Sequence, residues 1–230
     1  MANPVRDLPR PSLSLITRLR LLLFGHEDLA GIIFWAALTG VLGALASVAF
    51  REGTHLLERI FTGQRTSSLV NAAIQLIWWH RMTIPIVGGL LAGLILYWTG
   101  RALTVPRAVD YMEAVLVGDG RIAFRSTILT ALSSLCSISS GGSLGREGPM
   151  VQLAAMVGSK VGALSRASIP RLRLMVACGA AAGIAAAYNA PISGALFVSE
   201  IILGGTAMES FGPLVGASVV SSATVHRFLG

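Results

Sequence analysis

Five consecutive residues near the middle of the chain, Gly145-Arg146-Glu147-Gly148-Pro149, have the composition of a helix start that binds an anion. Proline is favoured in the first turn of a helix, because the N–H that it lacks would be unpaired there. The other N–H groups carry the positive end of the helix dipole, and the glycines allow an anion to approach them closely. The carboxylate of Glu147 is itself an anion at this position. These residues therefore predict an anion site that Glu147 can occupy with its own side chain.

Arg146 and Glu147 form an isolated charged pair, since no other charged residue lies within a dozen positions of either. An ionised side chain at the centre of a bilayer costs about 2.5 to 3.5 kcal/mol, so in a membrane it marks a functional site by default. In the alternative role, the two charges pair with each other or with remote partners and hold a loop in place. The residues alone leave both roles open.

A second motif overlaps the first, because Gly141-Gly142-Ser143-Leu144-Gly145 matches the G-x-S-x-G turn of serine hydrolases. That turn follows a strand, whereas residues 128–140 are uniformly apolar and small, as in a buried helix. The histidines that could act as a base all lie near polar or terminal segments: His26, His55, His80 and His226. The two cysteines lack the spacing of a zinc site. We therefore expect neither an enzyme nor a bound metal or cofactor.

The elements around these motifs are predicted to be membrane helices. Of the 230 residues, 53% are hydrophobic and 13% charged, against about a quarter charged in soluble domains. Several segments free of charge approach or exceed the ~20 residues that cross a bilayer. They are residues 30–50, 82–100, 128–145, 174–199 and 211–225. The fold class predicted is an all-α, polytopic integral membrane protein.

Glycine and proline cut the chain after Gly100 into pieces, several of which are too short to cross a membrane alone. Such broken, half-spanning helices are tolerated where their ends line a polar cavity, so they point to a site. Pairs of glycines four residues apart predict close helix packing. These pairs are Gly89/Gly93, Gly158/Gly162, Gly179/Gly183 and Gly212/Gly216.

The arginines before the first apolar segment predict the orientation of the chain. Residues 1–28 are expected to form a cytoplasmic N-terminus with an interfacial helix, and residues 29–230 the transmembrane part. The net charge of +7 does not indicate a nucleic-acid partner, because the arginines lie in the tail and between apolar segments. A lipid bilayer is the expected surrounding.

The string Gly145 to Pro149, together with "ACGAAAGIAAAYNAPISGALFVSE" from Ala177 to Glu200, resembles the CLC family of chloride channels and chloride/proton exchangers, and its bacterial members most. Two inverted repeats form one pore in that family. The resemblance implies that this chain is the first repeat, with the second repeat absent. It also implies a homodimer in the bacterial inner membrane, with residues 192–203 and 211–228 contributing to the interface.

By the same resemblance, Glu147 is the gating glutamate, which competes with chloride and swings away when protonated or displaced. Gly145, Arg146, Gly148 and Pro149 surround the anion beside it. A carboxylate suits such a gate because it mimics the anion when charged and withdraws when neutral.

The chain departs from the family pattern at two places. A Gly-Ser-Gly-Ile-Pro string, whose serine contacts the central chloride, should lie near residues 102–106, where only Thr104 offers a hydroxyl. Where exchangers carry an internal proton-transfer glutamate, one residue after Glu200, this chain has Ile201. These departures favour passive or weakly coupled transport of chloride. The alternatives are a chloride/proton antiporter that uses Glu200, or a non-conducting fragment of such a protein. Glu200 itself can instead be a structural residue at a helix end, paired with a nearby cation.

Overall fold

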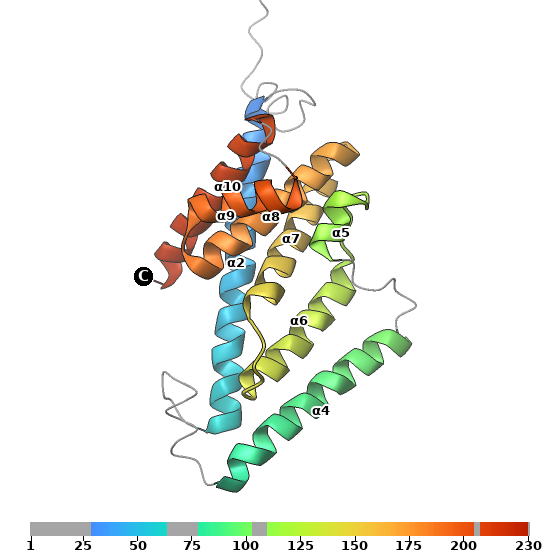
Figure 1. Ribbon diagram of the computed structural model, residues 1–230, viewed down its shortest axis with the longest axis vertical. Coiled ribbons are helices and arrows are strands. Elements are labelled where there is room, and N and C mark those ends of the chain that lie inside the picture. Colours follow the sequence, from blue (N-terminus) through green and yellow to red (C-terminus); the bar gives the residue numbers. More distant parts are fainter. Residues whose placement is uncertain (1–28, 64–77, 103–109, 205–207, 230) are drawn as a thin grey trace, which may run out of the picture.

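The computed structural model describes residues 29–63, 78–102, 110–204 and 208–229. Regular structure in these ranges is helical throughout (Figure 1). The helices are α2 (Leu29–Thr62), α4 (Trp78–Ala102), α5 (Tyr111–Leu116), α6 (Phe124–Ser139), α7 (Glu147–Leu164), α8 (Ile169–Tyr188), α9 (Pro191–Phe197), the π-helix η1 (Val198–Ile202) and α10 (Met208–Leu229). The all-α prediction is confirmed.

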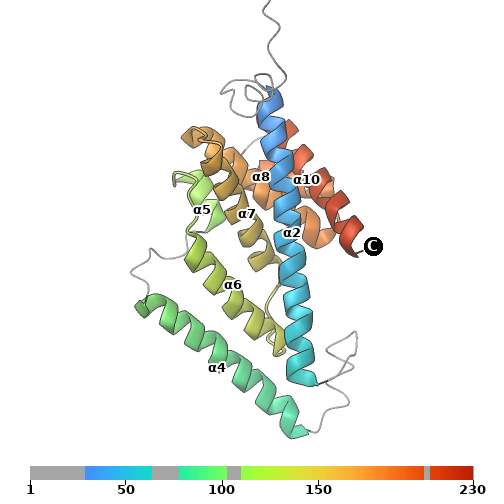
Figure 2. The ribbon, with the colours of Figure 1, turned by 180° about the vertical axis from the view of Figure 1, so that it is seen from behind.

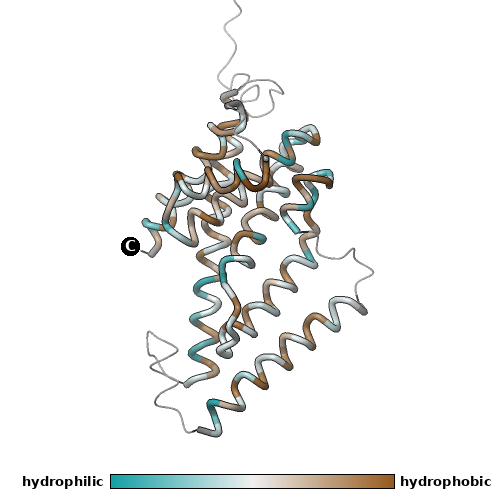
Figure 3. Tube along the Cα trace, viewed as in Figure 1, coloured by the Kyte–Doolittle hydropathy of each residue, from teal (hydrophilic) through white to brown (hydrophobic). Residues whose placement is uncertain are grey.

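Three of the helices are long and apolar enough to cross a membrane: Ala30–Thr62, Trp79–Gly100 and Ile169–Tyr188. They differ in how the rest of the chain covers them. Helix α8 is 72% buried over its most apolar window, whereas α4 is only 11% buried. Helix α4 accordingly lies at the edge of the molecule, where it packs on α6 (Figures 1 and 2). Hydrophilic residues gather in the second half of α2, and α4 is apolar or neutral over most of its length (Figure 3).

The predicted breaks in the later helices are present. Helix α6 ends at Ser139 after 16 residues, a rise of about 24 Å, which is shorter than the ~30 Å core of a bilayer. A further break was not predicted: the apolar stretch 174–199, expected to be one segment, is interrupted at Asn189, so that the buried helix α8 is followed by the short α9 and η1. The basic stretch between Lys160 and Arg173 is mostly helical, and only residues 165–168 connect α7 to α8.

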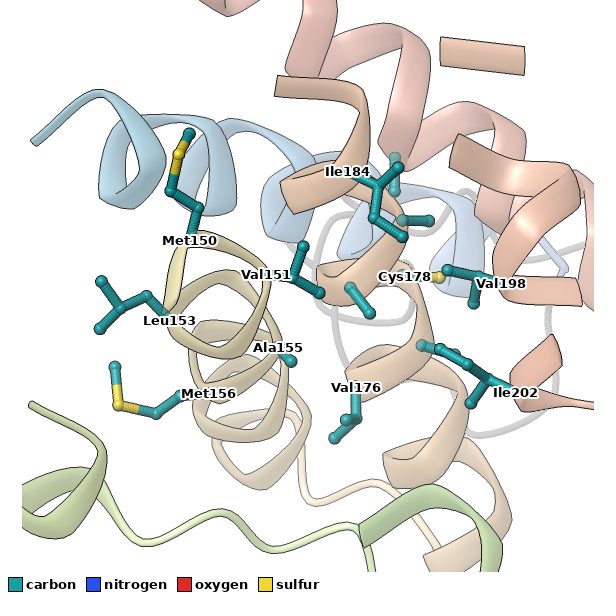
Figure 4. Packing of buried hydrophobic residues seen from close by; sticks show 14 of the residues in the cluster. Met150, Val151, Leu153, Ala155, Met156, Val176, Cys178, Ile184, Val198 and Ile202 are labelled. Atoms are coloured by element: carbon teal, nitrogen blue, oxygen red, sulfur yellow. The ribbon is translucent and has the colours of Figure 1, made fainter. Parts of the chain in front are cut away.

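The core lies where α7 and α8 pack against each other and against α2. Val151 on α7 points toward α8, and Cys178 on α8 points toward Val198, with Val176 and Ile202 in the same cluster (Figure 4). All five side chains are at most 5% exposed. Burial of this apolar surface stabilises the arrangement of the helices that carry the charged loop.

The predicted packing of glycine pairs is confirmed for two of the four pairs. A Cβ at Gly158 would collide with the carbonyl oxygen of Met175, and one at Gly179 with the carbonyl oxygen of Ala154. The glycine pair of α7 and the glycine pair of α8 therefore lie where these two helices touch. A Cβ at Gly89, Gly93, Gly212 or Gly216 meets no atom within 4 Å in the described part of the chain. Those two pairs are therefore not packing points between the described helices.

Ser159 ties the α5–α6 connection to α7. Its hydroxyl accepts a hydrogen bond from the Ile122 N–H (2.9 Å) and donates one to the Gly120 carbonyl (2.8 Å). The Arg173 Nε–H donates to the Gly118 carbonyl at 2.8 Å, which adds α8 to the same loop. These bonds hold the second half of α7, and its packing against α8 and α2 holds its middle. The expected interfacial helix and Thr104 lie outside the described residues.

Candidate anion site

The loop that leads into α7 turns sharply after α6. Gly141 has a φ of +95°, a backbone conformation that suits only glycine. The Gly142 N–H donates to the Ser137 carbonyl at 2.9 Å, and the Leu144 N–H donates to the Gly142 carbonyl at 2.8 Å. Because a helix precedes Ser143, the strand–turn–helix geometry of a serine hydrolase is not formed here.

Helix α7 begins at Glu147, which places the charged pair at a helix N-terminus as predicted. Pro149 is the third residue of the helix, and the Met150 N–H makes the first bond of the helical ladder, to the Arg146 carbonyl at 3.4 Å. Within the described ranges, no acceptor takes the N–H groups of Arg146, Glu147 and Gly148. Free N–H groups at the positive end of a helix dipole are the chemistry of an anion site.

The side chain of Glu147 folds back over Gly145. A Cβ built on Gly145 would lie only 2.7 Å from Glu147 Oε2, so the carboxylate rests directly against this glycine. Glu147 is half-buried, whereas Arg146 is exposed. In the part of the chain that the structure describes, the carboxylate forms no hydrogen bond and no salt bridge, with Arg146 or with any other group. A salt bridge between Arg146 and Glu147, which is one form of the structural alternative, is therefore not formed.

Glu200 and Ile201 lie together on η1, away from this loop. Glu200 is exposed, and Ile201 is 51% exposed, whereas the next residue, Ile202, is fully buried. The π-helix packs against α5, α8, α9 and α10. No hydrogen bond or ion pair joins Glu200 to Glu147 among the described residues, and no group of three or more His, Cys, Asp or Glu side chains there is placed to hold a metal ion.

Asn189 is a structural residue whose contacts the sequence did not reveal. It ends α8 in the left-handed conformation, with φ of 53° and ψ of 37°. The Ser222 hydroxyl of α10 donates to Asn189 Oδ1 at 3.0 Å, and Asn189 Nδ2 donates to Nε2 of His226 at 3.1 Å. The side chain thereby fastens the break between α8 and α9 to α10. An asparagine two residues before a proline could have pointed to the turn, but not to partners 33 and 37 residues away.

Substitution of Asn189 should separate the two roles of this residue. Asn189→Gly keeps the left-handed backbone and loses the side-chain bonds, at a cost of about 1 to 2 kcal/mol. Asn189→Ala adds the strain of a Cβ in that conformation, so it should be less stable by roughly another 1 kcal/mol. Thermal unfolding followed by circular dichroism in detergent measures both. Equal stabilities of the two variants would contradict the role of the backbone conformation.

Comparison with known proteins places these features in a single family. The model of the voltage gated chloride channel family matches residues 88–230. A putative chloride channel protein ClcB-like of Ralstonia nicotianae is 48% identical over 199 residues, which are 85% of this chain and 46% of the relative. A voltage-gated ClC-type chloride channel ClcB of Salmonella typhimurium is 45% identical over 199 residues, 85% of this chain and 47% of the relative.

A solved structure gives the same picture of the fold. The crystal structure of a slow cyanobacterial Cl-/H+ antiporter superposes with a TM-score of 0.68 at 18% identity, over 86% of this chain and 47% of the antiporter chain. At this identity the match speaks for the fold alone. The chain spans about half the length of the relatives that it matches.

Proposed function

Because this chain belongs to the voltage-gated chloride channel family, we propose that it supplies one half of a transmembrane pathway for chloride and other small anions. The observation that carries the proposal is the start of α7, where the N–H groups of Arg146, Glu147 and Gly148 have no acceptor within the described part of the chain. Pro149 completes this helix start, since proline has no N–H to pair, and Gly145 lies in the loop directly before it.

Glu147 is the gate of this proposed pathway. Its carboxylate is carried by the same helix start, so it can reach the N–H groups and exclude an anion from them. Protonation removes its charge, and with it the attraction to the positive end of the helix dipole. The flexible, half-buried side chain, which no salt bridge holds among the described residues, is free to move between positions. Anion flux should therefore increase as the pH falls.

Ile201 favours passive or weakly coupled transport over antiport. An isoleucine cannot carry a proton, and the adjacent Glu200 is the candidate for a residual proton path. The exposed position of Glu200 on η1 leaves it open to solvent or to a partner. Thr104 is the candidate hydroxyl for a central anion site.

The proposed surroundings are a bacterial inner membrane, with the N-terminus in the cytoplasm and a second copy of the chain as partner. The arginines before residue 29 support this orientation. Large apolar side chains of α9, η1 and α10 are exposed in the isolated chain, which supports an interface there. They include Ile192 (65% exposed), Leu196 (44%), Ile201 (51%) and Val219 (46%).

Reversal potentials test this function. The chain is joined at Gly230 to the second half of the Ralstonia relative, and this full-length chimera is placed in planar bilayers. We expect the reversal potential to follow the chloride gradient and to shift little with a proton gradient. A shift with the proton gradient that Glu200→Gln abolishes would establish antiport through Glu200. A reversal potential indifferent to chloride would contradict anion transport, and the 230-residue chain alone should conduct little.

A further inference from the structure

Gly145 differs from the other glycines of the loop, because no backbone requirement explains it. Gly141 needs its positive φ, and a Cβ at Gly142 would lie 2.6 Å from the Ser137 carbonyl oxygen. Gly145 has no positive φ, so its backbone conformation is open to alanine. Within 4 Å of a Cβ at this position, the described residues place only Glu147 Oε2, at 2.7 Å, and Glu147 Cδ, at 3.9 Å.

The carboxylate over Gly145 is also not bound at the helix N-terminus. It accepts no hydrogen bond from the N–H groups of Arg146, Glu147 or Gly148 in the described structure, although they belong to the same turn. The position beside Gly145 is thus distinct from the proposed anion site, and it leaves that site free.

We propose that Gly145 is a positioning residue that provides the resting place of the Glu147 carboxylate when the anion site is open. This inference rests on the proposed function, in which Glu147 is the gate. Without a side chain at residue 145, the carboxylate can leave the N–H groups and lie against the backbone of the loop. A methyl group there removes this second position and confines the carboxylate to the helix N-terminus, where it excludes the anion.

Gly145→Ala is therefore a mutation that closes the pathway while leaving every polar group in place. Crowding by one methyl group shifts an equilibrium of this kind roughly tenfold, so chloride efflux from liposomes containing the chimera should fall about tenfold. The effect must require the Glu147 side chain. In a Glu147→Ala background, the same methyl group should change the efflux by less than about twofold, because the coupling partner is gone.

The matched control is Gly93→Ala on α4, where a Cβ meets no atom within 4 Å among the described residues, and its efflux should equal that of the parent. Melting temperatures of all variants are measured alongside. Gly145→Ala should melt with the parent, since only the flexible end of Glu147 has to move.

Three results would overturn the inference. An equal fall in both backgrounds would mean that the methyl group blocks the anion itself. An unchanged or increased efflux in Gly145→Ala would mean that the position beside Gly145 is not the open one. A Gly145→Ala protein that does not fold would mean that glycine serves the backbone. Failure of the proposed function is seen separately, in the single variant Glu147→Ala, whose pH response would then match the parent.

Discussion

Replacement of Glu147 by glutamine is expected to raise chloride flux through the full-length chimera about tenfold at neutral pH and to remove most of its pH dependence. A charged group gains up to about 2 kcal/mol at a partly buried helix terminus, and a difference of 1.4 kcal/mol is a factor of ten in occupancy. Glutamine keeps the length of the side chain but has neither charge nor proton to lose. It competes weakly for the N–H groups at every pH. Chloride efflux from liposomes over a range of pH measures both effects.

Glu113→Gln is the matched control for this experiment. Glu113 is exposed on α5 and undergoes the same chemical change, so its variant should keep the pH response of the parent. Glu147→Ala should behave like Glu147→Gln, because the two share the loss of charge and differ in bulk. A Glu147→Gln protein whose efflux still rises with acidity as in the parent would show that another group is the gate.

The start of α7 was predictable because its causes are local. Proline and glycine act on the backbone of their own turn, and a helix dipole acts within the first turn, so five consecutive residues carried the information. The structure places Glu147 as the first residue of α7 and Pro149 in its first turn, as that pattern indicates. The break at Asn189 also has a local cause, the proline at position 191, but the segment 174–199 was predicted to be continuous.

The contacts between helices were not predictable, because they depend on what each face meets. The pairs Gly158/Gly162 and Gly89/Gly93 have the same spacing, yet only the first lies at a described helix contact. The bond from Ser222 to Asn189 joins residues 33 positions apart, and no short-range pattern encodes it. The resting place of the Glu147 carboxylate was hidden for a related reason. From sequence alone, a glycine is equally compatible with contact to an anion, with a turn, or with space left for a neighbouring side chain.

Gly158→Ala should have the largest effect on stability, at about 3 kcal/mol. The added Cβ would overlap the carbonyl oxygen of Met175, and it would also lie 3.3 Å from Cγ2 of Thr39 on α2. A flexible side chain can turn away from such a contact, but a backbone carbonyl within α8 moves only if the helix moves. Overpacking in a tight core typically costs about 1 to 3 kcal/mol, and backbone contact places this site at the upper end.

Gly89→Ala is the control, in which the same methyl group is added at a position without neighbouring atoms. A Cβ at Gly89 meets no atom within 4 Å among the described residues, so the variant should be unchanged or more stable by up to about 1 kcal/mol from helix propensity. Thermal unfolding of both variants in detergent measures the difference, and equal melting temperatures would contradict close contact between α7 and α8.

The Gly158→Ala substitution should also affect the proposed gate, Glu147. Residues of both α8 and α2 lie against α7 at Gly158, so a Cβ there should displace the helix whose first residue is Glu147. Gly158→Ala should therefore also reduce chloride efflux in the chimera, although residue 158 lies eleven positions from Glu147.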